Sequence, residues 1–274
     1  MKNFFCRPFV IVNDNYDLLK QLVKRNISAR YKGTVFGSVW TVAQPFMLLM
    51  VYTFVFSVVF KSRWGGASGE NLTNDKYAFA MIIFCGMTVF NIFSDSITNS
   101  PNLIISNPNY VKKVIFPLEI LSFAQVITSV IVNFVWLIIL FIGSVLLMNS
   151  LSWTMLLLPI IFIPYILMTI GLSFFLSSVG VFFRDISQFC LLIVNVLFMG
   201  TPIFYSLDMV PGKFKYVLML NPLTWFVEET RAVFLFKQYP NWIALAIISL
   251  ISIICFYSGF VWLQKTKKGF ADVI

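Results

Sequence analysis

The sequence predicts an all-α integral membrane protein, and its composition, its apolar runs and the placement of its tryptophans support this class. Of 274 residues, 59% are hydrophobic and 11% are charged, whereas soluble domains carry about 25% charged residues. The mean hydropathy is +0.88. Several apolar runs approach the roughly 20 residues that a helix needs to cross a bilayer. Tryptophans fall at or beside the ends of these runs, as is typical of membrane interfaces.

We expect six transmembrane helices in a single membrane domain, residues 1–274. Their approximate bounds are residues 41–60, 77–93, 121–148, 155–180, 186–205 and 242–263. The second helix is short and is expected to end before Asp95. Prolines inside these segments predict kinks. An even number of helices places both termini on one side, together with thirteen of the 20 Lys and Arg residues, so we expect both termini in the cytoplasm.

Residues 13–32 predict an amphipathic helix ahead of the first span. Leu19, Val23, Ile27 and Tyr31 recur at every fourth position, and Gly33 is a helix-ending residue. The basic side chains of this segment are Lys20, Lys24, Arg25, Arg30 and Lys32. A basic amphipathic helix is typical of an interfacial anchor on an anionic leaflet.

Residues 211–237 predict a helical hairpin on the opposite side of the membrane, before the last span. Asn221 is a good N-cap, and Pro222 suits the first turn of the second helix. One face of that helix is apolar, with Leu223, Phe226, Val227, Val233 and Phe234, and the other carries Thr224, Glu228 and Arg231. Charges at this density exclude a span surrounded by lipid. We expect the helix to lie in the interface or to re-enter a hydrated, protein-lined cavity.

Residues with enzymatic or metal-binding chemistry are scarce. Histidine is absent, and the four cysteines are isolated in the sequence, which excludes His-dependent triads and the common zinc motifs. Gly212-Lys213-Phe214 lacks the upstream glycine and the hydroxyl of a P-loop. Asp95, Glu119 and the Arg184-Asp185 pair fall near predicted helix boundaries, so no ionisable residue is evident at a membrane midplane, which disfavours ion-coupled transport. We expect no metal and no cofactor in this chain.

Four segments, in chain order, resemble the permease subunits of ABC exporters for polysaccharides and polyol phosphates. The stretch RYKGTVFGSVWTVAQPF resembles the family signature at Arg30, Tyr31, Gly37, Trp40 and Pro45, with conservative departures at Thr34 and Phe36. The remaining matches are the elbow from Asn107 to Pro117, the segment Thr201–Tyr205 and the segment Asn221–Leu223. Members include the O-antigen (Wzm), capsule (KpsM) and teichoic acid (TagG) permeases, and the resemblance is nearest to the Wzm type.

The resemblance implies a half-transporter in the bacterial cytoplasmic membrane. Two copies would form a homodimer with the path between them. Each copy would bind a separate nucleotide-binding subunit that holds ATP and Mg. The substrate would be a lipid-linked polysaccharide: O-antigen first, with capsular polysaccharide and teichoic acid as alternatives. The residues expected to receive the motion of the ATPase are Lys20, Lys24, Arg25, Arg30, Tyr31, Lys112, Lys113, Arg184 and Asp185.

Aromatic side chains suit a sugar path because their flat faces stack on sugar rings. Trp40 and Phe46 are expected beside the entrance. The residues expected at the exit and its gate are Phe198, Pro202, Phe204, Tyr205, Trp225, Phe226, Glu228 and Arg231. The hairpin is interpreted as an external gate, with a lid that only seals lipid from water as the alternative.

Three other functions remain open. A membrane-integral sugar transferase or acyltransferase would act without an ATPase, and so would a lipid scramblase or a structural scaffold. An exporter of drugs or small lipids is the third. Activity of the purified chain, or its failure to bind a nucleotide-binding partner, separates the first two from an exporter.

Overall fold

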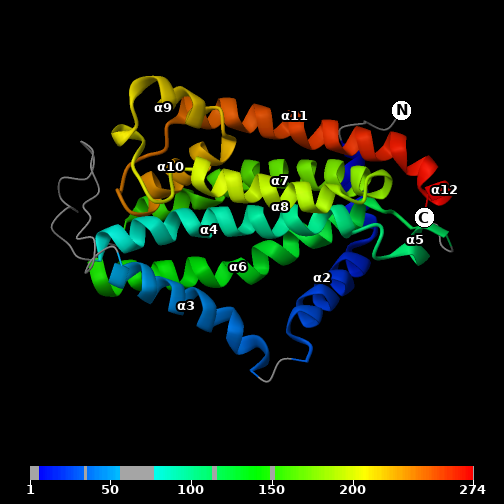
Figure 1. Ribbon diagram of the computed structural model, residues 1–274, viewed down its shortest axis with the longest axis horizontal. Coiled ribbons are helices and arrows are strands. Elements are labelled where there is room, and N and C mark those ends of the chain that lie inside the picture. The colour runs from blue at the N-terminus through cyan, green and yellow to red at the C-terminus, as the bar shows by residue number, and fades with distance from the viewer. Residues whose placement is uncertain (1–5, 34–35, 56–76, 113–115, 149–151, 274) are drawn as a thin grey trace.

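The computed structural model describes residues 6–33, 36–55, 77–112, 116–148 and 152–273, and every element in these ranges is a helix. Apolar helices make up the bundle (Figure 1): α3 (Trp40–Tyr52), α4 (Ala78–Asn99), α6 (Glu119–Met148), α7 (Leu158–Phe182), α8 (Ile186–Gly200) and α11 (Trp242–Thr266). Within the described residues, four stretches are long and apolar enough to cross a membrane: Ala78–Asn102, Glu119–Leu146, Trp153–Phe182 and Trp242–Gly269. The apolar helices Trp40–Val55 and Ile186–Gly200 are shorter.

These six helices fall where the sequence predicts spans, but two predicted bounds are wrong. The fifth span, residues 186–205, ends early because α8 stops at Gly200 and Thr201 is extended, with φ −103° and ψ 137°. Pro202 explains this end, since proline pushes the preceding residue out of the helical region. The last residues of the predicted first span, 56–60, lie outside the described residues.

The second span is expected to end at residue 93, and this predicted end is also wrong. The helix α4 continues to Asn99, so Asp95 lies inside it. The Asp95 carboxylate accepts a hydrogen bond from the guanidinium of Arg30 at 2.5 Å. A paired carboxylate does not need to leave the helix for water, which is why the charge fails to mark the boundary.

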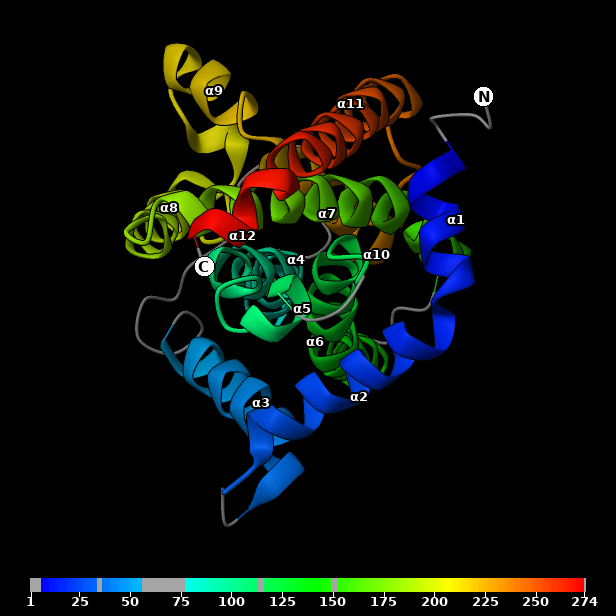
Figure 2. The same cartoon turned by 90° about the vertical axis from the view of Figure 1, so that its right-hand side faces the viewer.

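The two ends of the bundle differ in what they carry. Both termini, α1 (Arg7–Asp14), α5 (Pro108–Lys112) and α12 (Phe270–Val273) lie at one end, here called the terminal end (Figures 1 and 2). The helices α9 (Gly212–Met219) and α10 (Pro222–Phe234) lie at the opposite end, here called the hairpin end. The two hairpin helices and the helices α1 and α12 are therefore at opposite ends of the bundle.

The helix α4 is the centre of the core. Its apolar stretch is 83% buried, and α3, α6, α7, α8 and α10 pack around it (Figure 2). Beside it, α7 and α11 approach so closely that a Cβ added to Gly259 would lie 2.0 Å from the carbonyl oxygen of Gly171. Small residues allow this backbone contact, a common way for helices to associate in lipid.

The predicted amphipathic helix is present as α2 (Tyr16–Tyr31), three residues shorter at its start than expected. Leu19, Leu22 and Val23 are buried, where α2 packs across α6 (Figure 1). The chain bends at Asn15, so α1 is a separate helix that the sequence does not predict. Gly33, with φ +87°, follows the end of α2 as expected.

Candidate functional site

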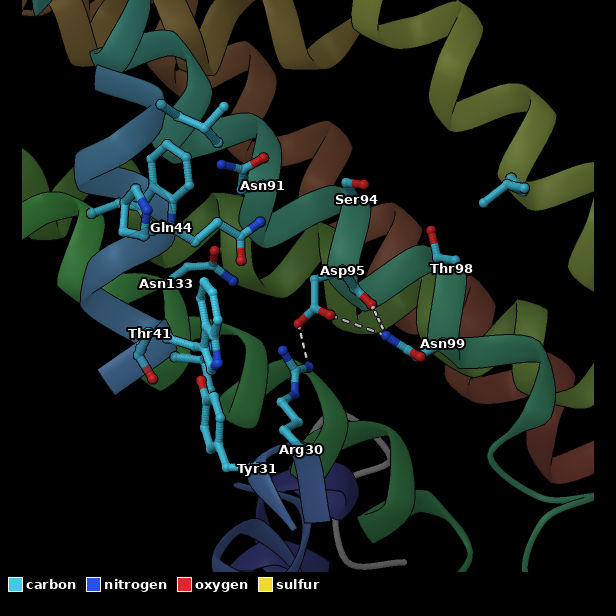
Figure 3. Close-up of a pocket in the computed structure, with 16 residues that line it drawn as sticks. Arg30, Tyr31, Thr41, Gln44, Asn91, Ser94, Asp95, Thr98, Asn99 and Asn133 are labelled. Carbon is cyan, nitrogen blue, oxygen red and sulfur yellow. Dashed lines mark hydrogen bonds and ion pairs between the residues drawn. The ribbon is translucent and has the colours of Figure 1, made fainter. Parts of the chain in front are cut away.

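A polar cavity of about 530 Å³ opens beside α4, in the half of the helix nearer the terminal end. Its polar lining comes from α2, α3, α4 and α6 (Figure 3) and consists of Arg30, Tyr31, Thr41, Gln44, Asn91, Ser94, Asp95, Thr98, Asn99 and Asn133. Trp40, Pro45, Leu48, Val132, Trp136 and Leu191 complete it. We call this cavity the polar groove. Such a lining is unusual in helices whose other surfaces are apolar, and it marks a functional site.

The sequence of α4 creates one polar side for this groove. Asn91, Ser94, Asp95, Thr98 and Asn99 are spaced by three or four residues, so they share one face of the helix. The first half of α4 has no such face, since every residue from Ala78 to Phe90 is buried. The groove therefore begins where α4 changes from an apolar helix to an amphipathic one.

Three carboxamides from three helices gather in one part of the groove. Gln44 comes from α3, Asn91 from α4 and Asn133 from α6, and their side chains lie near one another in Figure 3. Asn133 also donates from Nδ2 to the backbone oxygen of Ser129 at 2.8 Å. A carboxamide both donates and accepts hydrogen bonds, so the cluster matches a ligand that does both.

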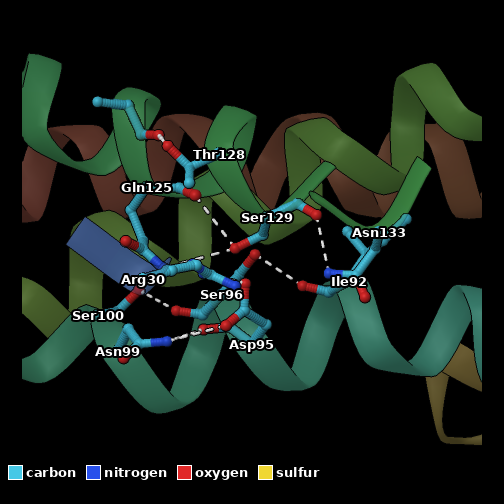
Figure 4. A network of polar contacts seen from close by, with 11 residues as sticks. Arg30, Ile92, Asp95, Ser96, Asn99, Ser100, Gln125, Thr128, Ser129 and Asn133 are labelled. Carbon is cyan, nitrogen blue, oxygen red and sulfur yellow. Dashed lines mark hydrogen bonds and ion pairs between the residues drawn. The ribbon is translucent and has the colours of Figure 1, made fainter. Parts of the chain in front are cut away.

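The two charged residues among those lining the groove neutralise each other. Arg30 Nη2 lies 2.5 Å from Asp95 Oδ2, and the side chains are 27% and 21% exposed. Asn99 Nδ2 also donates to Asp95 Oδ1 at 3.0 Å (Figure 4). This ion pair ties the last turn of α2 to α4 at the groove.

Further polar side chains follow α4 and α6 away from the groove. Ser96 of α4 and Ser100, which directly follows α4, donate to the carbonyl oxygens of Ile92 and Ser96, each at 2.7 Å (Figure 4). On α6, Gln125 Nε2 donates to Ser129 Oγ at 3.4 Å. Bonds to a helix's own backbone let buried hydroxyls be satisfied in an apolar environment.

Aromatic rings pack against one another near the groove, on the side toward the hairpin end. Phe198 of α8 packs against Phe90 of α4, with centroids 5.1 Å apart, and against Phe204, at 5.3 Å. Phe204 in turn meets Tyr52, which follows the lining residues of α3, at 6.1 Å. These four residues are called the aromatic cluster below. It joins α3, α4 and α8, and its member Phe90 directly precedes Asn91, the first residue of α4 that lines the groove.

At the hairpin end, Arg231 of α10 is fully buried. Its guanidinium donates to the backbone oxygens of Ile82 at 3.2 Å, Pro202 at 2.5 Å and Ile203 at 2.8 Å. It also lies 2.8 Å from Glu228 Oε1. A Cβ added to Gly86 would lie 2.8 Å from Arg231 Nη2, so the glycine makes room for this side chain.

The structure corrects one expectation for α10, that its polar face is exposed. Its apolar residues are buried as expected, and Asn221 accepts from the backbone N–H of Leu223 at 3.0 Å. Thr224 and Arg231, expected on the opposite polar face, are buried as well. The hydroxyl of Thr224 donates to the backbone oxygen of Leu218 at 2.8 Å, and Arg231 donates to the free carbonyls that follow the end of α8. Burial raises the pKa of the Glu228 carboxyl, and the neighbouring Arg231 charge opposes this rise.

Most of the residues expected to contact an ATPase lie at the terminal end. Lys20, Lys24, Lys112, Arg184 and Asp185 are exposed there. Arg25, also exposed, donates to the hydroxyl of Tyr110 on α5 at 3.1 Å. Arg30 and Tyr31 lie in the polar groove instead. Lys113 is outside the described residues.

The residues expected along a path are dispersed. Trp40 lines the polar groove, whereas Phe46 is exposed on α3 and does not line it. Phe226 is buried in the core against Tyr165, with centroids 5.1 Å apart. Tyr205 and Trp225 form hydrogen bonds at the hairpin end. The hydroxyl of Tyr205 donates to Met199 O at 3.0 Å, and Trp225 Nε1 donates to Met219 O at 2.8 Å.

Sequence reasoning missed the neutral polar residues of the groove. Gln44, Asn91 and Asn133 are single amides inside apolar runs, and a search limited to charged groups passes over them. The usable signal is that a polar side chain at membrane depth faces a protein interior or a cavity. Within the described residues, no group of three His, Cys, Asp or Glu side chains comes together to hold a metal.

Comparison with known families identifies the family of the chain. Residues 17–235 match the sequence model of the family described as ABC-2 type transporter. The chain belongs to this family. It is thus a multi-pass membrane subunit of a transporter, as the resemblance implies.

Named relatives align along almost the whole chain. An O-antigen export system permease protein RfbA from Klebsiella pneumoniae is 29% identical over 261 residues, covering 94% of this chain and 95% of the relative. An RfbA of the same description from Myxococcus xanthus is 25% identical over 260 residues, again covering 94% and 95%. The alignments are therefore nearly end to end in both proteins.

Proposed function

We propose that this chain is the transmembrane permease subunit of an ATP-driven exporter that moves a lipid-linked polysaccharide, O-antigen first, across the bacterial cytoplasmic membrane. The names of its full-length relatives support this substrate. Capsular polysaccharide and teichoic acid are the alternatives. Both termini are then cytoplasmic, and all six apolar helices cross the membrane.

The observation that carries the proposal is the polar groove. Its carboxamides and hydroxyls can donate to and accept from sugar hydroxyls, and Tyr31, Trp40 and Trp136 add rings beside them. Aromatic rings with a polar handle combine apolar area with hydrogen bonding, which suits a sugar. Lipid tails offer no partners for these groups.

A second copy of the chain completes the path. The groove is bordered by Leu48 of α3 and Leu191 of α8. On these two helices, apolar side chains that a partner can cover are exposed: Val42, Phe46, Met47, Met50, Leu192, Val196 and Met199. A two-fold pair that meets along α3 and α8 brings two grooves to face each other.

The energy source lies outside this chain. A nucleotide-binding subunit, with its ATP and Mg, docks at the terminal end against the exposed Lys20, Lys24, Lys112 and Arg184. Its motion reaches the groove through α2, which is tied to α4 by Arg30 and Asp95. The hairpin of α9 and α10 is the external gate, and the aromatic cluster closes the groove below it.

Export by leucine variants of the groove amides tests the proposal. Asn91→Leu and Asn133→Leu keep the size of the side chain but remove its hydrogen bonds. We expect both to lose export of the lipid-linked glycan by cells, while membrane insertion and recovery with the ATPase subunit are unchanged. Asn102→Leu is the matched control, because Asn102 is exposed and does not line the groove. Full export by both groove variants would contradict the proposal.

The rival sugar transferase is tested by the chain alone. A transporter subunit purified without an ATPase should neither transfer sugar to lipid nor move glycan across a vesicle membrane. Glycan transfer or movement under those conditions would replace the exporter with an enzyme or a scramblase.

A further inference from the structure

If the chain is the proposed exporter subunit, the polar side chains of the polar groove indicate which class of glycan it carries. We infer that it passes an uncharged, hydroxyl-rich glycan and disfavours a polymer with an anionic group on every repeat, such as a polyol phosphate. The inference rests on which side chains line the groove and on how its charges are paired.

The groove offers hydrogen bonds without net charge. Among its sixteen lining residues, the charged ones are Arg30 and Asp95, which form an ion pair with 2.5 Å between Nη2 and Oδ2. The other polar groups are carboxamides and hydroxyls together with the indole N–H groups. An anion that enters must therefore compete with Asp95 for the guanidinium of Arg30.

Two of the described cations nearer the hairpin end, Arg231 and Lys215, are paired too. Arg231 is fully buried and bonded to Glu228 and to three backbone oxygens. Lys215 of α9 lies 3.0 Å from Asp208. Lys213 and Lys237 are exposed to the surroundings and do not line the groove. The described path therefore has no row of free cations that could follow an anionic chain.

Physical chemistry then separates the two substrate classes. A charge that leaves water needs a paired counter-charge, because its loss of hydration is large. A sugar hydroxyl needs one acceptor and one donor, and a carboxamide supplies both. A single phosphate at the lipid anchor meets this problem once, whereas a polyol phosphate meets it at every repeat. A second copy of the chain contributes the same neutral lining.

The test compares the transport rates of two polymers that carry the same lipid anchor. The full transporter, both subunits together, is reconstituted in vesicles with a lipid-linked neutral glycan or with a lipid-linked glycerol phosphate chain of equal length. Transfer across the membrane with ATP is read as the fraction protected from added degrading enzymes. We expect the neutral glycan to move faster by about tenfold or more. Equal rates, or faster transfer of the phosphate polymer, would overturn the inference and leave the proposed function intact.

Two variants should change the preference of the transporter between the two polymers. Asp95→Asn leaves Arg30 without its carboxylate, and Asn91→Lys adds a cation among the carboxamides. Each should raise the ratio of phosphate polymer to neutral glycan by about tenfold, whatever its effect on the total rate. An unchanged ratio in both would contradict the inference. Transfer of neither polymer by the unaltered transporter would remove the proposed function and, with it, this inference.

Discussion

Arg231 Nη1 donates a hydrogen bond to the backbone oxygen of Pro202 at 2.5 Å. This bond joins the last turn of α10 to the point at which proline ends α8. The same guanidinium reaches Ile82 of α4, so one side chain holds three helices together at the hairpin end. The helices α10 and α8 belong to the proposed gate and path. Arg231 therefore fixes the position of the gate relative to the path.

Replacing this charge should destabilise the protein. Arg231→Leu leaves Glu228 half-buried without its partner and removes the donors from the carbonyls of Pro202 and Ile203. We expect the free energy of unfolding to fall by about 3–5 kcal/mol, as when one partner of a buried pair is removed. Thermal unfolding in detergent measures the change.

Lys215→Leu is the control for the loss of a cation at the hairpin end. Its partner Asp208 is 59% exposed, and surface pairs contribute about 0–1 kcal/mol. Equal losses of stability in the two variants would contradict a special role for Arg231.

The contact between α7 and α11 makes a second prediction. Gly259→Ala places a Cβ 2.0 Å from the carbonyl oxygen of Gly171, and backbone on both sides leaves nothing flexible to move. Overpacking of this kind costs about 1–3 kcal/mol. Gly212→Ala should be nearly neutral, since no atom lies within 4 Å of its added Cβ. Unfolding temperatures compare the two, and a Gly259→Ala protein as stable as the parent would show that the helices separate readily.

Swapping the charges of Arg30 and Asp95 tests whether the pair links ATP hydrolysis to transport. Arg30→Asp and Asp95→Arg alone should each reduce the glycan exported per ATP hydrolysed, because α2 loses its tie to α4. The double variant should recover part of this yield, since it restores an attractive pair. ATP hydrolysis and export are measured on the same vesicles. A double variant no better than the worse single one would rule out the pairwise link.

The aromatic cluster should act as a seal. Phe204→Ala removes the ring that contacts both Phe198 and Tyr52. We expect vesicles with this variant to leak small solutes without ATP, read as release of a trapped dye. Phe214→Ala, on the exposed face of α9, should not leak. Tight vesicles with Phe204→Ala would show that the seal lies elsewhere.

Much of this fold follows from the sequence because burial in lipid leaves a simple pattern. Apolar length placed the six helices, Gly33 followed the end of α2, and the stripe of Leu19 and Val23 predicted which face of α2 is buried. Errors arose where a single polar residue had two physical solutions. Asp95 could end a helix or find a cation inside the bundle, and only the position of Arg30 decides between them.

The site was less predictable than the fold for the same reason. Arg231 looks like a solvent-facing charge in its own helix, and its carbonyl partners come from distant segments, 28 to 149 residues away in sequence. The groove depends on Gln44, Asn91 and Asn133 arriving from three helices. Periodicity within one helix carries no information about that convergence.

The central claim, that exported glycan passes along the polar groove, is tested most directly by photo-cross-linking. A photoreactive amino acid is placed at Asn133, in the groove, or at Ile138, which lies on α6 but lines a separate apolar pocket. Export is then stalled in cells and the proteins are irradiated. The account predicts that glycan attaches to the chain labelled at position 133 and not at 138. Equal attachment at both positions, or attachment only at 138, would contradict it.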